Sequence, residues 1–62
     1  MKRTIKASLA YIGRNVPWLA KQLGMSESTC RRRLNDDGWT LPDLRRMKEL
    51  FKWDEDTVRR II

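Results

Sequence analysis

Apolar residues recur at helical spacing in several short stretches of this chain of 62 residues. Residues three and four apart lie on one face of an α-helix, so each stretch predicts a helix with one inward-facing stripe. The first stripe consists of Ile5, Leu9 and Ile12. We expect its helix to be capped by Thr4 and ended by Gly13. No stretch alternates in the way that predicts a β-strand, so the pattern indicates an all-α fold of five helices.

Residues 19–35 predict a helix, a turn of three residues and a second helix. The apolar residues of the first of these helices share one face: Leu19, Ala20 and Leu23. Gly24 favours a helix end, because glycine adopts the left-handed backbone conformation without steric cost. Ser26 is a suitable N-cap for the next helix, whose inner face holds Cys30 and Leu34. This arrangement is typical of a helix-turn-helix.

The outer face of the second of these helices is polar and basic. Its residues follow the spacing i, i+3, i+4, i+7, and they are Ser28, Arg31, Arg32 and Asn35. Glu27 lies beside them at the helix start. Such a face is small and polar at its beginning and cationic further along, which suits a helix that reads the major groove of DNA.

A fourth helix has the most complete start signal, after a turn predicted at residues 36–38. Thr40 is a good N-cap, Asp43 is the carboxylate of a capping box, and Pro42 suits the first helical turn. The inner stripe of this helix is expected to hold Leu41, Leu44, Met47 and either Leu50 or Phe51. The charged residues between them are expected to face water.

A fifth helix is predicted to begin after Asp54, its expected N-cap, with Glu55 and Asp56 where the helix dipole favours carboxylates. Three apolar residues follow, namely Val58, Ile61 and Ile62. They either close the core against the first helix or form the seam of a homodimer.

The net charge of +6 is unevenly distributed along the chain. Residues 1–35 carry eight basic side chains and one acidic one, whereas residues 36–62 carry six basic and seven acidic ones. The part that holds the predicted helix-turn-helix is therefore the basic one, which favours a polyanionic partner. The alternative is a basic surface kept for solubility.

Composition excludes several classes of function. One cysteine allows no internal disulfide, and without histidine a zinc site or a Cys/His nucleophile pair lacks its residues. We expect one domain over residues 1–62, no enzymatic activity, no cofactor, no metal and no small-molecule ligand. No apolar run reaches the length of a membrane span, so a cytoplasmic protein is expected. Cys30 is expected to be a small buried apolar residue.

Over residues 16–58 the chain resembles the phage repressor and Cro family, the lambda-repressor-like or XRE group. The resemblance lies in the segments 19–29, 34–35 and 39–44, that is in LAKQLGMSEST, LN and WTLPDL. It implies a compact five-helix domain with its helix-turn-helix at the second and third helices. It also implies a transcriptional regulator of the prokaryotic cytoplasm or nucleoid that binds double-stranded DNA as a homodimer, on half-sites about one helical turn apart. Such a regulator is expected to repress by blocking polymerase, with activation as the alternative.

The resemblance also implies roles for individual residues. The expected base-reading residues are Ser26, Glu27, Ser28, Arg31 and Arg32. The expected phosphate contacts are Arg14, Asn15, Lys21, Arg33 and Asn35. For Glu27 two interpretations stay open: it accepts a hydrogen bond from a cytosine, supported by Arg31, or it only stabilises the helix dipole.

Two other functions are weighed against DNA binding. The same fold could be a protein-interaction module, for instance an antitoxin or an anti-repressor partner, that uses the tryptophans and the apolar C-terminal residues. A basic amphipathic segment for anionic membranes fits poorly, because the apolar residues are divided among several capped helices.

Overall fold

The computed structural model describes residues 1–61 of the chain, and the side chains of residues 1–59. This part contains five helices and no strand, so the all-α prediction is confirmed. The helices are α1 (Lys2–Tyr11), α2 (Val16–Leu23), α3 (Glu27–Asp36), α4 (Leu41–Phe51) and α5 (Glu55–Ile61). None of them is long and apolar enough to cross a membrane, a finding that covers the described residues only.

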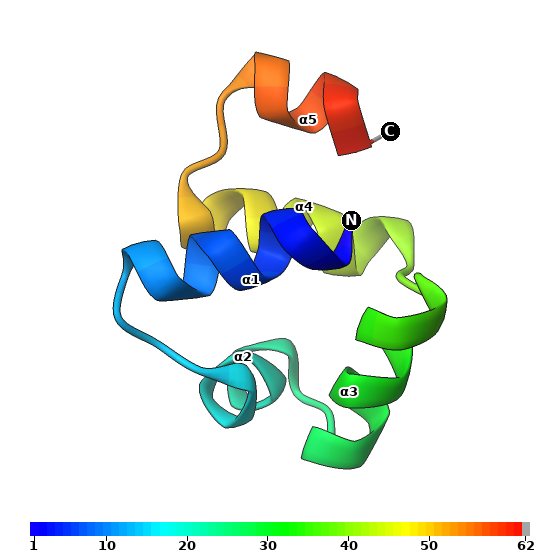
Figure 1. Cartoon of the computed structure of the whole chain (residues 1–62). Coiled ribbons are helices and arrows are strands. Elements are labelled where there is room, and N and C mark those ends of the chain that lie inside the picture. Colours follow the sequence, from blue (N-terminus) through cyan, green and yellow to red (C-terminus); the bar gives the residue numbers. More distant parts are fainter. Residues whose placement is uncertain (62) are drawn as a thin grey trace.

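The helices are arranged in three levels (Figure 1). Helices α1 and α4 occupy the middle, α2 and α3 lie on one side of them, and α5 lies on the opposite side. Helices α2 and α3 pack directly on each other. The pair that sequence patterning predicted as a helix-turn-helix therefore forms one end of the molecule.

The core is built from residues of the first four helices. The buried residues are Ile5, Leu9, Leu19, Ala20, Cys30, Leu34 and Met47. Full burial of an aliphatic side chain stabilises a fold by about 1.5–3 kcal/mol, so this cluster supplies much of the stability of a small domain. The inward orientation predicted for Cys30 and Leu34 is confirmed, since they are 0% and 3% exposed.

Local capping bonds fix where the helices begin. The side chains of Asn15, Ser26 and Thr40 each accept a hydrogen bond from a backbone amide three residues later. Thr40 and Asp43 form the complete capping box, as predicted. The carboxylate of Asp54 accepts from the amide of Thr57 at 2.8 Å, which confirms its capping position. These bonds satisfy amides that the helix itself leaves without partners.

Three expectations about individual residues are wrong. Thr4 does not cap α1, because the helix begins at Lys2 and Met1 is its N-cap. Ile12 is 37% exposed because it follows the last residue of α1, so it no longer lies on the helical stripe. Leu41 is 56% exposed as the first residue of α4, where a side chain leans toward the helix N-terminus and away from the core.

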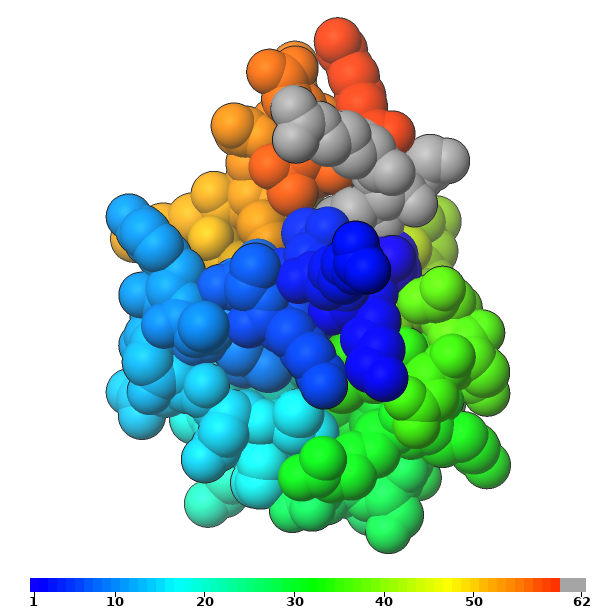
Figure 2. Space-filling model, in the orientation of Figure 1, coloured from blue at the N-terminus to red at the C-terminus, as the bar shows by residue number. Residues whose placement is uncertain are grey.

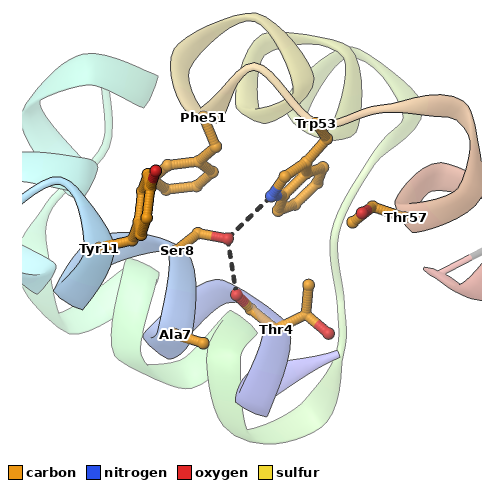
Figure 3. Close-up of a pocket in the computed structure, with 7 residues that line it drawn as sticks. All are labelled: Thr4, Ala7, Ser8, Tyr11, Phe51, Trp53 and Thr57. Atoms are coloured by element: carbon orange, nitrogen blue, oxygen red, sulfur yellow. Dashed lines mark hydrogen bonds between the residues drawn. The ribbon is translucent and has the colours of Figure 1, made fainter.

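A hydrogen bond joins α1 to Trp53, which lies in the segment that leads into α5. The indole N–H of Trp53 donates to Ser8 Oγ at 2.8 Å, and Ser8 Oγ donates in turn to the Thr4 carbonyl at 2.8 Å (Figure 3). The ring of Phe51 lies 5.4 Å from that of Trp53. Val58 is half-buried, whereas the side chain of Ile61 and all of Ile62 lie outside the described residues, and with them most of the expected dimer seam.

Candidate nucleic-acid interface

The turn between α2 and α3 is tightly defined by backbone hydrogen bonds. Gly24 takes the left-handed conformation, with φ of 69°, and its amide donates to the carbonyl of Lys21 at 3.2 Å. The amide of Met25 donates to the carbonyl of Ala20 at 3.0 Å. These bonds occupy carbonyls at the end of α2, so the direction in which α3 leaves the turn is fixed.

Helix α3 presents a continuous polar face to solvent. Its exposed residues are Glu27, Ser28, Arg31, Arg32, Asn35 and Asp36. Cys30 and Leu34 anchor the opposite face in the core. Because these inward positions are locked, the exposed face cannot rotate without unpacking the core.

The five residues expected to read bases differ in the hydrogen bonds and ion pairs that they make. Ser26 uses its hydroxyl for the cap, since Oγ accepts from the amide of Thr29 at 3.1 Å and donates to Thr29 Oγ1 at 2.9 Å. Glu27 and Arg31 form an ion pair of 2.9 Å, with side chains 49% and 55% exposed. Ser28 and Arg32 are exposed and make no hydrogen bond or ion pair within the described part of the chain.

The expected phosphate contacts at α2 are exposed. The guanidinium of Arg14 lies 5.4 Å from the centre of the Trp18 ring, in a cation–π contact. Asn15 uses its side-chain oxygen as the cap of α2, accepting from the amide of Trp18 at 3.1 Å. Lys21 is exposed on the same helix. Trp18 itself is half-buried and packs against the core.

The two expected phosphate contacts on α3 differ. Asn35 is exposed and its side-chain oxygen accepts from Lys2 Nζ at 2.9 Å, which leaves the amide group to donate. Arg33 instead donates to Asp43 at 2.6 Å, and its side chain is only 27% exposed. The structure therefore directs the Arg33 guanidinium toward α4 rather than toward solvent.

Two lysines of α1 belong to the same surface and were not among the expected site residues. Lys2 and Lys6, with Arg31 and Asn35, line a hollow of about 220 Å³ between α1, the start of α2 and α3. Their spacing of four residues on one helix face is a signal in the sequence. Without knowing that α1 lies against α3, this signal does not differ from that of an ordinary solvated face.

Within residues 1–61 no group of three or more potential ligands could hold a metal ion. Burial raises the pKa of the Cys30 thiol above its ordinary value, and the nearby Arg31 opposes this only in part. A thiol in this state is a poor nucleophile at neutral pH.

Comparisons with protein-family models, with curated proteins and with solved structures find no match to this chain.

Proposed function

We propose that this chain is a sequence-specific double-stranded DNA-binding protein that regulates transcription, acting as a repressor with α3 in the major groove. The observation that carries the proposal is the outer face of α3, where Ser28 and Arg32 are exposed without internal partners while Cys30 and Leu34 fix the helix from behind. The lambda-repressor-like arrangement of the helices, with α2 across the DNA backbone, is part of the same proposal.

The chemistry of this face matches the edges of base pairs. An arginine donates two parallel hydrogen bonds to guanine O6 and N7, and a serine hydroxyl accepts or donates at any base. Each good bidentate contact contributes about 1–3 kcal/mol of discrimination between bases. Arg32 is the residue of α3 best suited to this role, because no carboxylate competes for its guanidinium in the described part of the chain.

The surrounding charge supports binding to the DNA backbone. Arg14 and Asn15 are exposed just before α2, and Lys21 is exposed near the end of α2, ahead of the turn that leads into α3. Cations that neutralise phosphates release counterions and provide most of the non-specific affinity. Binding as a homodimer to two half-sites, in the cytoplasm or nucleoid of a prokaryotic cell, belongs to the proposal as the expected mode of repression.

The proposal is tested by selecting bound sites from a random oligonucleotide pool and measuring affinity for the selected site at increasing salt. We expect affinity to fall linearly on a logarithmic salt scale. Arg32→Ala should reduce the preference for the selected site, whereas Lys21→Ala should weaken binding to all duplexes about equally and flatten the salt dependence. Two-fold symmetry in the selected sites indicates a dimer.

Two results contradict the proposal. Equal affinity of the wild type and the Arg31→Ala/Arg32→Ala double variant for the selected site would falsify the role of α3. A chain that binds no duplex even at low salt would favour the protein-interaction module of the same fold.

A further inference from the structure

The polar face of α3 divides into two rows. Successive residues of an α-helix are rotated by about 100°, so Arg31 and Asn35 form one row and Ser28 and Arg32 form another. Arg31 and Asn35 line the hollow with Lys2 and Lys6 of α1, and neither residue of the second row does. The first row therefore faces the α1 side of the molecule. Figure 2 shows the surfaces of α1, α2 and α3 meeting on this face.

The hollow concentrates positive charge. Lys2, Lys6 and Arg31 contribute three cations, and no carboxylate lines it. Glu27 cancels part of this charge by pairing with Nε of Arg31, which leaves the two terminal nitrogens of that guanidinium as donors. A net excess of positive charge therefore remains on a small concave surface, and an anion is the ligand that relieves it.

The hydrogen-bonding groups also suit an anion. Lys2 Nζ donates to Asn35 Oδ1 at 2.9 Å, so the acceptor of that amide is occupied and its N–H₂ group is the part left to donate. A lysine bound in this way keeps two further N–H donors. A water occupies about 30 Å³ in the liquid, so a hollow of about 220 Å³ accommodates a hydrated phosphate group.

We propose that this hollow binds one phosphodiester group of the DNA backbone, held by Lys2 and Lys6 of α1 together with Arg31 and Asn35 of α3. The inference rests on the proposed function, and it makes α1 part of the DNA interface. It assigns Arg31 to the backbone instead of to the bases. Arg32 and Ser28 then remain as the base-reading row.

The test measures the affinity of the full chain for a synthetic duplex of mixed sequence, and for a site selected by the wild type, by fluorescence anisotropy across a salt series. We expect the Lys2→Gln/Lys6→Gln variant to bind both duplexes several-fold more weakly, by the same factor. Its slope of log affinity against log salt should be smaller by about one, as for one lost phosphate contact. Arg31→Gln should likewise weaken both duplexes equally, while Arg32→Ala changes their ratio.

A matched control removes the same charge elsewhere. Lys48→Gln/Lys52→Gln alters two exposed lysines of the α4 end and should leave the slope close to that of the wild type. Circular dichroism establishes that each variant is folded, which is expected because all four lysines are exposed. Lys2→Arg/Lys6→Arg should retain the affinity.

The outcomes separate the inference from the proposed function. If the wild type binds DNA and Lys2→Gln/Lys6→Gln binds it with the same affinity, the phosphate site alone is overturned. The same conclusion follows if the control variant Lys48→Gln/Lys52→Gln loses as much affinity as Lys2→Gln/Lys6→Gln. A loss of selectivity in Arg31→Gln also overturns it. A wild type that binds no duplex overturns the proposed function, and this inference with it.

Discussion

The guanidinium of Arg33 donates to the Asp43 carboxylate across 2.6 Å and so joins α3 to the first turn of α4. The same carboxylate oxygen accepts from the backbone amide of Thr40 at 3.2 Å. Both charged side chains are half-buried, at 27% and 15% exposure, so water competes little for the pair. One carboxylate thus completes a helix cap and fixes α3 relative to α4.

Asp43→Ala is expected to lower the free energy of unfolding by about 2 kcal/mol, because it removes a charge-assisted hydrogen bond and half of a capping box. Urea unfolding followed by circular dichroism measures this. Glu49→Ala removes an exposed carboxylate from the same helix and should change stability by less than about 0.5 kcal/mol. Equal losses in the two variants would show that the Arg33 contact contributes nothing.

Ser8→Ala is expected to destabilise the contact between α1 and the residues before α5. The variant leaves the indole N–H of Trp53 without its partner, at a cost of about 1–2 kcal/mol. Hydrogen exchange of that indole proton, followed by NMR, should become faster. Ser28→Ala is the matched control, since Ser28 is exposed and makes no contact of this kind in the described chain. Unchanged exchange in Ser8→Ala contradicts the role of the hydroxyl.

Glu27→Gln is expected to increase affinity for DNA of mixed sequence. The substitution removes a negative charge from α3 and frees Arg31 from its ion pair, while stability changes little because both side chains are about half exposed. Anisotropy at moderate salt measures the change, with Glu49→Gln as a control of equal charge on α4. If the variant instead loses affinity for the selected site, the result indicates that Glu27 accepts a hydrogen bond from a base.

The pKa of Cys30 predicts a pH dependence of stability. Burial raises this pKa in the folded state, so the unfolded chain releases the thiol proton at lower pH than the folded one. The stability that the buried, protonated thiol contributes is therefore fully present below the ordinary pKa of a thiol. This stability decreases as the pH rises above that value. Between neutral and alkaline pH, the free energy of unfolding measured in urea should decrease less for Cys30→Ala than for the wild type. The native thiol should react with alkylating reagents only slowly. Equal pH dependence in both proteins contradicts burial as the cause.

Features governed by near neighbours could be predicted from the sequence. The caps at Ser26 and Thr40 reach only three residues along the chain, and the inward positions Cys30 and Leu34 follow from helical spacing alone. Thr4 was wrong as a cap because α1 extends past it to Lys2, and nothing in the side chain of Met1 signals that start. Local chemistry identifies a suitable cap, but packing decides whether the helix uses it.

Contacts between residues that are far apart along the chain could not be predicted from the sequence. Lys2 meets Asn35 across 33 positions of the chain, and Arg33 meets Asp43 across ten. Neither pairing follows from periodicity, because each depends on how two helices lie against one another. For this reason the sequence could not predict that Arg33 pairs with Asp43, or that Lys2 and Lys6 lie beside α3.

Helix α5 lies at the far end of the molecule from α2 and α3 (Figure 1), and its first turn carries Glu55 and Asp56. Residues 1–35, which include α2 and α3, carry eight basic and one acidic side chain, whereas residues 36–62, which include α5, carry six basic and seven acidic ones. This uneven distribution of charge gives the domain a permanent electric dipole moment. The electric field of a strongly negative partner exerts a torque on this dipole before any contact forms. During diffusion the basic part of the domain therefore turns toward the partner. A larger share of first collisions is then productive, an advantage that dissolved ions weaken as their concentration rises.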